Sequence, residues 1–533
     1  MKISERTFSV FWAAHAWIGA LTSSILFVTF FLGAFALFWE DLGPWQEPRL
    51  RHAAPVAEER TIELVQREVS RQVELAPARL DIQLPDDHAP WILVAMRGRE
   101  GDPRFEWIDP ATGEPVPPRS DLGFFLYLMH FLWPIPGGGH VAGIAAVLLL
   151  FLLISGVIIH LNKLWQELAL FRPSLRLRLV WSDAHKVLGV IGLPFQVVIA
   201  WTGALLCLQS TVGPIFVQTT LGGDRGALDH ALSLGASVRP AGEPGAAPDV
   251  RLILARAREA LPRARHTQLI FRNLGDRDAY VDVRGEQEDG LLRQTSVRIS
   301  ARDGAVLFAR GPGGASRYSR ATEAFYALHL ASYGGAGLRI AYALLALLGA
   351  LGIVTGVLVW LERRRRRGLG VGDVLLARLT AGGCAGACLA VAALFIANQL
   401  LPDDLPGRPG WEHRAFYAAW GAAVVFCLAR RSAAASARDL LLAAGGLLAI
   451  VPALDGLRNH RVPFDPRAPS HVLGPDVGLL CGAALLVVAG LLIRRIAARA
   501  DAEERAGQRQ AASPLGAPPA GLAALETSME NGT

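Results

Sequence analysis

Long apolar runs alternate with polar segments along the chain, and their lengths predict membrane-spanning helices. Four of these runs lie within residues 1–39, 122–165, 178–207 and 323–367. Each holds about 20 mainly apolar residues, the length that a helix needs to cross the hydrocarbon core of a bilayer. Residues 370–496 contain about four more, rich in Ala, Leu and Gly and joined by short loops. The pattern predicts a polytopic, mainly α-helical membrane protein.

Two longer segments, residues 40–121 and 208–322, are too polar for the hydrocarbon and are predicted to lie outside it. Each combines apolar residues at helical spacing with strand-like runs, such as WILVAM in the first and YVDVRG in the second. We therefore expect an external α+β domain in each. The Gly-, Ala- and Pro-rich stretch GASVRPAGEPGAAPD in the second segment is typical of a mobile linker.

The order of these elements repeats within the chain. A span, an external α+β domain and a second span occupy residues 1–165, and the same series occupies residues 178–367. The endings ISGVIIH and VTGVLVW of the second and fourth spans also match. Both copies enter the membrane from the same side, which makes the repeat parallel, with an axis along the membrane normal. The predicted fold is two parallel repeats followed by a C-terminal bundle of about four spans.

Histidines recur at matching places in the two copies. His15 and His185 lie near the cytoplasmic face, at the starts of the first and third spans, and His130 and His329 lie near the external face. An ionisable side chain inside a membrane is costly unless it is satisfied, and it marks a functional candidate. Each face receives one histidine from each copy, and two neutral imidazoles on opposing helices can bind one haem iron. The pattern predicts two b-type haem sites.

Two glycines support this interpretation. Gly19 and Gly189 each follow a histidine, His15 or His185, by four residues and so lie one turn along the same helix face. Because glycine has no side chain, a porphyrin could lie against the helix there. We expect these two residues to be close-approach glycines of the haem sites.

Other histidines and other metals are weaker candidates. His140 and His160 occur in the second span only, and they could support the ligands, replace one of them or belong to a third site. Zinc would need three or four clustered ligands, and copper would have no Met or Cys support here. The five cysteines are scattered and no C-x-x-C-H occurs, so covalently attached haem is not indicated.

The basic residues are predicted to set the topology. The net charge is +6, and Lys and Arg cluster just after spans, as in the arginine run at 363–367. This is the positive-inside pattern, and it indicates membrane anchoring among lipids, with no nucleic-acid partner. It predicts a multi-pass membrane protein with both termini cytoplasmic and the α+β domains on the external side. Residues 497–533 are charged and then rich in Ala, Pro and Gly, and they predict a disordered cytoplasmic tail.

At several motifs the sequence resembles the PepSY-associated transmembrane helix family. They are HAWIGA, LMHFLWPIPGGG, GIAAVLLLFLLISGVIIH, SDAHKVLGVIGLPFQ, ALHLASYGGAG and VTGVLVW. The resemblance implies a protein of a bacterial inner membrane with PepSY-like domains in the periplasm, b-type haem, and an oxidoreductase activity that reduces ferric siderophores. The ligands that it implies are His15, His185, His130 and His329. Nothing resembles a flavin- or nicotinamide-binding domain, so a separate protein or a quinol would supply the electrons.

Two other classes of function stay open, a permease for iron or siderophore and a regulatory protein whose PepSY-like domains bind peptides. Cys384 and Cys388, one turn apart, could form a thiol or metal pair, although such cysteines usually serve packing. External arginines could attract anionic iron complexes: Arg97, Arg99, Arg272 and Arg277. Loop residues of the C-terminal region could form an iron-handling cluster: Asp403, Asp404, Glu412, His413, His460 and His471.

Overall fold

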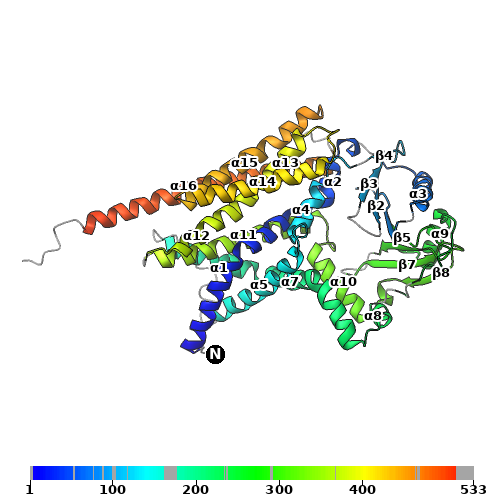
Figure 1. Cartoon of the computed structure of the whole chain (residues 1–533), viewed down its shortest axis with the longest axis horizontal. Coiled ribbons are helices and arrows are strands. Elements are labelled where there is room, and N and C mark those ends of the chain that lie inside the picture. The colour runs from blue at the N-terminus through cyan, green and yellow to red at the C-terminus, as the bar shows by residue number, and fades with distance from the viewer. Residues whose placement is uncertain are drawn as a thin grey trace, which may run out of the picture.

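The structure is a computed structural model in which apolar helices occupy one part of the molecule and a β-sheet with short helices the other (Figure 1). It describes residues 4–51, 55–75, 77–86, 89–98, 104–116, 118–160, 177–232, 235, 238–287, 292–365, 368–462, 464 and 469–511. By length and composition, seven helices in this part of the chain could cross a membrane. The chain is therefore a multi-pass membrane protein.

Four long helices form the core of the apolar part. They are α1 (Glu5–Ala36), α5 (Gly138–His160), α7 (Leu177–Thr220) and α11 (Ala336–Arg365). α1 packs against α5 and α11, and α7 packs against the same two helices. The four helices therefore form a ring. α7 runs beyond residue 207, where the sequence placed the end of the third span.

The C-terminal helices form a bundle beside this ring (Figure 1). They are α12 (Val371–Thr380), a π-helical turn (Ala381–Ala385), α13 (Gly386–Leu400), α14 (Arg408–Ala429), α15 (Ala433–Arg458) and α16 (Ser470–Ala511). Three candidate spans fall here, namely Val371–Leu400, Ala433–Arg458 and Ser470–Ile496. The sequence predicted about four. α14 packs against α13 but is not a candidate span.

The C-terminal tail begins differently from the prediction. Residues 497–511 continue α16 as a helix, where the sequence predicted disorder from 497 onwards. The stretch ADAEERAGQRQA is rich in Ala, Glu, Gln and Arg, which are strong helix formers, so the helix continues past the apolar segment. The rest of the predicted tail, 512–533, lies outside the described residues.

The two polar segments of the sequence build one antiparallel sheet. Its strand order is β4-β3-β2-β1-β5-β6-β7-β8. The first segment supplies β1 (Arg79–Gln83), β2 (Ile92–Arg97), β3 (Arg104–Ile108) and β4 (Pro115–Val116). The second supplies β5 (Arg265–Arg272), β6 (Tyr280–Glu286), β7 (Gln294–Ser300) and β8 (Val306–Arg310). β1 pairs with β5 from Arg79↔Arg272 to Gln83↔Gln268, which joins the two segments.

One face of this sheet is covered by two helices, α3 (Glu58–Val73) and α9 (Val250–Ala260). Alternate apolar residues of the strands, such as Ile82 and Leu269, are fully buried in one core with Val65 of α3 and Ile253 of α9. This alternation is the period of two that the sequence shows in these strands. The shared core makes the two segments a single packing unit.

The opposite face of the sheet lies toward the helices at the membrane edge. These are α2 (Trp39–Gln46), α4 (Leu122–His130) and α10 (Arg317–Leu330), and the short α8 (Arg225–Ala231) follows α7. Trp107 of β3 lies close to Gly43 of α2, and Arg310 of β8 donates a hydrogen bond to Ser319 of α10. The predicted linker is partly tied to the sheet domain, because Asp276 accepts hydrogen bonds from the backbone of Ala241 and Gly242.

Buried ion pairs fasten the C-terminal bundle to the first segment. Arg51 donates to both carboxylate oxygens of Asp455 of α15, at 3.0 and 2.8 Å. Arg461 binds Asp455 at 2.6 Å and also Asp476 of α16 at 2.6 Å, and Trp45 of α2 donates to Asp476 at 2.9 Å. Both aspartates are 0% exposed. Their charges are therefore compensated almost entirely by these partners.

Replacing Asp455 by asparagine should strongly destabilise the junction. Arg51 and Arg461 would keep buried charges with too few acceptors, and breaking a buried pair costs about 3–5 kcal/mol. The free energy of unfolding in detergent measures the loss. Asp439→Asn is the matched control, because Asp439 and its partner Arg430 are 35% and 38% exposed and an exposed pair contributes about 1 kcal/mol or less. Equal losses in the two variants would contradict the expectation.

Candidate functional site

The four repeated histidines form two pairs. His130, at the end of α4, and His329, near the end of α10, have ring centroids 6.2 Å apart and ring planes at 37°. We call them the outer pair, because they lie on the side of the sheet. His15 of α1 and His185 of α7 also have centroids 6.2 Å apart, with planes at 75°. We call them the inner pair. Each pair takes one histidine from each half of residues 1–367.

The spacing within each pair suits two ligands of one metal ion. A metal–imidazole bond is about 2 Å long, so imidazoles on opposite sides of one ion have centroids about 6 Å apart. Both pairs have this separation. The residues therefore fit a bis-histidine haem iron, and the assignment of all four as haem ligands stays a prediction.

Backbone carbonyls orient two of the rings. His130 Nδ1 lies 2.6 Å from the carbonyl oxygen of Thr29, and His185 Nδ1 lies 2.8 Å from that of Gly352. A carbonyl oxygen only accepts hydrogen bonds, so each imidazole carries its proton on Nδ1. The lone pair on Nε2 of both histidines is then available to a metal.

Hydroxyl groups orient the other two rings in the same way. His15 Nδ1 lies 2.9 Å from Ser155 Oγ, and His329 Nδ1 lies 2.8 Å from Thr202 Oγ1. Both hydroxyls already donate to carbonyls of their own helices, Ser155 to Leu152 and Thr202 to Val198. Each hydroxyl therefore accepts a hydrogen bond from the Nδ1–H group of its imidazole. Nε2 of these two histidines is then also available to a metal. Such partners of Nδ1 fix the ring and raise the basicity of a ligand.

Each of the four rings also lies against a glycine of a neighbouring helix. A Cβ atom at Gly33 would lie 2.9 Å from His130 Cε1, and one at Gly203 would lie 3.2 Å from His329 Cε1. In the inner pair, the corresponding distances are 3.4 Å from Gly156 to His15 and 3.0 Å from Gly356 to His185. A side chain at Gly33, Gly203 or Gly356 would crowd the imidazole beside it, whereas at Gly156 a Cβ atom would just make van der Waals contact with His15. Two of these glycines, Gly156 and Gly356, belong to the matching endings ISGVIIH and VTGVLVW of the second and fourth spans.

The predicted close-approach glycines do not touch the histidines. A Cβ atom at Gly19 would meet only Leu152 within 4 Å, at 3.7 Å, and one at Gly189 would meet nothing described within that distance. Both positions leave room beside the helix. Their predicted contact with a porphyrin is compatible with this space and stays a prediction.

The other membrane histidines differ from the four. His140 uses Nε2, at 2.7 Å from Thr211 Oγ1 of α7, so the atom that the four present to a metal is occupied here. His160 lies one turn beyond Gly156 on α5, near enough to His15 for an electrostatic interaction. It therefore belongs to the surroundings of the inner pair. Its predicted role as an alternative ligand is untested.

The predicted cluster of acidic residues and histidines in the C-terminal loops does not assemble. Among the described residues, no group of three or more His, Cys, Asp and Glu could hold a metal ion. Glu412 is fully buried against Arg408, and His413 binds Asp121 at 2.8 Å, so the proposed loop cluster is dispersed. Cys384 and Cys388 are free and buried in the core.

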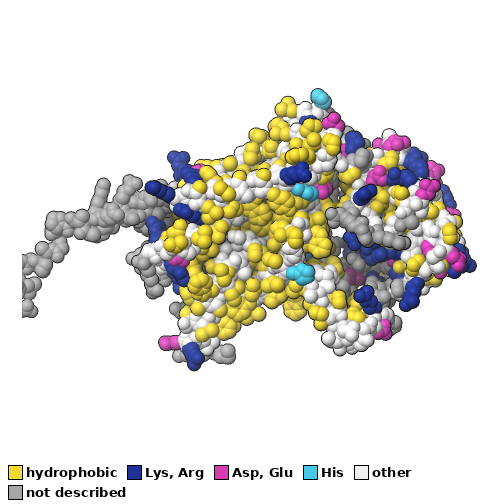
Figure 2. All heavy atoms as spheres, viewed as in Figure 1, with side chains coloured by type: hydrophobic (Ala, Val, Ile, Leu, Met, Phe, Trp, Pro, Cys, Tyr) yellow, Lys and Arg dark blue, Asp and Glu magenta, His cyan; other side chains and the backbone are white. Residues whose placement is uncertain are grey.

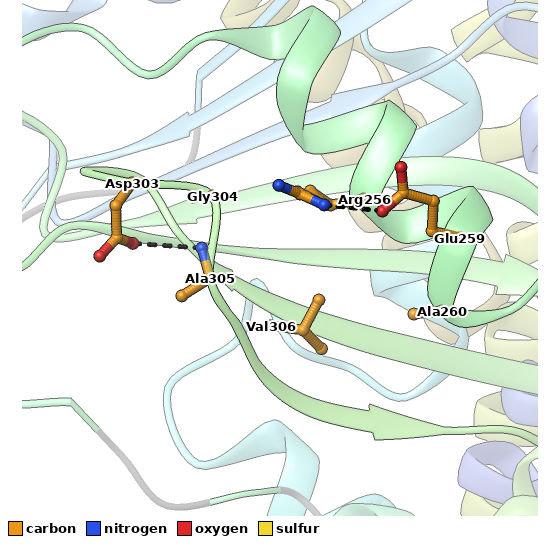
Figure 3. A pocket seen from close by; sticks show the side chains of 7 residues that line it. All are labelled: Arg256, Glu259, Ala260, Asp303, Gly304, Ala305 and Val306. Carbon is orange, nitrogen blue, oxygen red and sulfur yellow. Dashed lines mark hydrogen bonds and ion pairs between the residues drawn. The ribbon is translucent and has the colours of Figure 1, made fainter.

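A cavity of about 580 Å³ lies far from the histidines in the fold, between the end of α9 and the turn before β8 (Figure 3). Its charged side chains already have partners. Glu259 binds Arg256 at 2.8 Å, and Asp303 accepts from the backbone N–H of Ala305 at 3.1 Å. The cavity therefore offers no unsatisfied group for catalysis.

The fold and the site together define a multi-pass membrane protein with a histidine pair toward each end of its helix ring. Residues 12–363 match the sequence model of the family described as PepSY-associated TM region, and the chain belongs to this family. It is 30% identical, over 354 residues, to the uncharacterized protein PA4219 of Pseudomonas aeruginosa. That alignment covers 64% of this chain and 87% of the relative. The family match contains both pairs and the sheet, whereas α12–α16 lie outside it.

Replacing Thr202 by valine should weaken metal binding at the outer pair. Valine keeps the shape of threonine but removes the acceptor of the His329 Nδ1–H, and loss of such a partner typically costs about 10–100-fold in affinity. Haemin titration of the protein prepared without haem measures the affinity. The control is Thr219→Val, because Thr219, also on α7, makes the same type of bond to the carbonyl four residues earlier. Equal affinities in the two variants would contradict the assignment.

Proposed function

We propose that this chain is a di-haem electron-transfer protein of a bacterial inner membrane, which reduces a ferric chelate, such as a ferric siderophore, in the periplasm. The observation that carries the proposal is that the four histidines share one hydrogen-bonding arrangement. All four engage Nδ1 and present Nε2, and they meet in two pairs whose separation suits an iron between them.

The positions of the two pairs support a route across the membrane. His15 and Gly33 mark the inner and the outer pair on α1, and they are 18 residues apart, which is about 27 Å of helix. His185 and Gly203 mark the pairs on α7 with the same spacing. A bilayer has a hydrocarbon core of about 30 Å. The pairs would therefore lie near opposite faces.

The parallel repeat is also part of the proposal. The two inner histidines face equivalent glycines, Gly156 and Gly356. Beside them, Ser155 and Thr355 donate to the carbonyls of Leu152 and Gly352, three residues earlier in each helix. Matched contacts of this kind are expected if two copies of one unit build the ring.

The chain's own residues bind and orient the redox groups. Haem b bound by each pair would supply an iron that accepts and donates one electron. The Nδ1–H groups are held by Thr29, Ser155, Thr202 and Gly352, which keeps the four rings in place between the helices. A membrane quinol or a reduced protein would supply the electrons on the side of the inner pair. One electron converts the iron(III) of the chelate to iron(II), which hard oxygen ligands bind less strongly.

The charge pattern supports the proposed orientation. Arginines at the end of α11, Arg363 to Arg365, lie on the side away from the sheet. By the positive-inside rule this side is cytoplasmic, so the sheet would be periplasmic. A permease role has less support, because the buried acids of the C-terminal bundle pair with arginines, Glu412 with Arg408 and Asp455 with Arg51.

Haem content tests the proposal first. A reduced-minus-oxidised spectrum of the purified protein should show about two b-type haems per chain. His185→Ala should remove the haem of the inner pair and His329→Ala that of the outer pair. His140→Ala should keep both, because its Nε2 is already bonded to Thr211. Protein expressed with sufficient haem that still binds none would refute the redox function.

Electron flow tests the direction. The intact protein is first reduced with a quinol analogue. Its haems should then be oxidised rapidly when a ferric siderophore is added. His329→Ala should still accept electrons but reduce the chelate at least tenfold more slowly, because the inner pair is about 27 Å from the outer one. Stopped-flow absorbance at the haem bands measures both steps. An unchanged rate in His329→Ala would contradict the proposed order.

A further inference from the structure

The face of the sheet opposite α3 and α9 bridges the two helices that carry the outer pair. Phe105 of β3 packs on Phe124 of α4, with ring centroids 4.8 Å apart. At the other side, the backbone N–H of Gln294 in β7 donates to Glu323 of α10 at 2.7 Å. Phe124 and Glu323 each precede the histidine of their helix by six residues, or about 9 Å. The strands between them, β2, β1, β5 and β6, therefore span the space above the pair.

These four bridging strands place arginines on this face. Arg79 of β1 lies directly opposite Arg97 of β2 on one side and Arg272 of β5 on the other. Arg284 of β6 lies on the same face, since it is opposite Gln268, which pairs with Gln83 of β1. From β3 to β7 there are five strand intervals of about 4.8 Å each, so the bridged width is about 24 Å.

The acidic residues of this face are already paired. Asp81 binds Arg79 at 2.7 Å, Asp282 binds Arg298 at 2.7 Å and Glu286 lies 3.6 Å from Arg293. Arg97, Arg272 and Arg284 have no ion pair or hydrogen bond within the part of the chain that the structure describes. Three positive charges therefore face the space above the outer pair without an ion pair or hydrogen bond from the described residues.

This arrangement is unfavourable for the fold by itself. Like charges directly opposite each other on adjacent strands destabilise a sheet. Desolvation, and then the charge of Arg79, lower the pKa of Arg284 although Asp282 and Asp81 oppose the shift, which reflects the same crowding of positive charge. An anionic ligand would relieve it. Guanidinium groups bind paired oxygen atoms such as those of carboxylates in a bidentate way.

Figure 2 shows dark blue Lys and Arg side chains on the sheet domain where it faces the apolar helices. We propose that this sheet face forms the roof of a chamber above the outer pair, in which Arg97, Arg272 and Arg284 bind an anionic, oxygen-rich ferric chelate. The identity of the ligand rests on the proposed function, because only an electron acceptor has reason to lie beside the outer pair. The charge of the site does not depend on it.

Binding of a redox-inactive chelate tests the roof directly. The probe is the gallium(III) tris-catecholate complex, which carries three negative charges, titrated calorimetrically into the full chain in nanodiscs. Arg272→Gln, Arg97→Gln and Arg284→Gln should each weaken its binding about tenfold or more, as expected for hydrogen bonds to charged groups. Added salt should weaken binding to the unmodified protein. An uncharged gallium(III) tris-hydroxamate should be affected much less by the substitutions.

Arg256→Gln is the matched control, with the same change of charge on α9, which covers the other face of the sheet. It should bind the probe like the unmodified protein. Loss of binding in Arg256→Gln but not in Arg272→Gln would place the anion in the cavity of Figure 3 and overturn the proposal. Inorganic phosphate that binds as tightly as the chelate would also overturn it, because the site would then not select a chelate.

Stability separates binding from a structural role. Arg272→Gln removes a like-charge contact, so its thermal midpoint without ligand should be equal to or above that of the unmodified protein. The complex should raise the midpoint of the unmodified protein more than that of the variant. A lower midpoint of the variant would show that Arg272 serves the fold. Gallium cannot accept the electron, so binding of its complex does not depend on electron transfer. A protein that binds the complex but no haem would refute only the proposed function. A protein that binds haem but shows no arginine-dependent binding of the complex would refute only the proposed roof.

Discussion

The core of this structure depends on one constraint, which is that each buried imidazole needs a hydrogen-bond partner for its N–H group. A histidine among apolar helices must bond its N–H group within the protein, because no water is available in the hydrocarbon. Each of the four histidines does so with a group on a neighbouring helix, through Nδ1. The same helix approaches closely because it has a glycine there. The same contacts thus set the position of each imidazole, its tautomer and the packing of the helices around it.

The sequence predicted the histidines but not their partners. His15, His185, His130 and His329 stood out because their spacing repeats, and the pairing across the two halves followed from that symmetry. The acceptors could not be predicted, since two are backbone carbonyls, which any residue has. Gly156 and Gly356 were visible as a repeated position, yet only the helix packing shows that each faces an imidazole.

The sequence predicted one α+β domain in each polar segment, whereas the structure joins the strands of both segments in one sheet. Alternating apolar residues indicated strands in both segments, and the strands formed. That pattern sets which face of a strand is buried but not which strand is its neighbour, so the pairing of β1 with β5 was not predictable. The row of Arg97, Arg79 and Arg272 depends on this register. In the sequence, Arg97 and Arg272 stood out only as external arginines and Arg79 did not stand out, so nothing indicated that the three form one row.

The joined sheet has a mechanical consequence. A transporter that works by alternating access rocks one half of its structure against the other. Here the two halves share five consecutive residue pairs between β1 and β5, from Arg79↔Arg272 to Gln83↔Gln268, and one hydrophobic core beneath them. Rocking would have to break that ladder and expose the core. The sheet instead acts as a rigid clamp that holds α4 and α10, and with them the outer histidines, at a fixed separation.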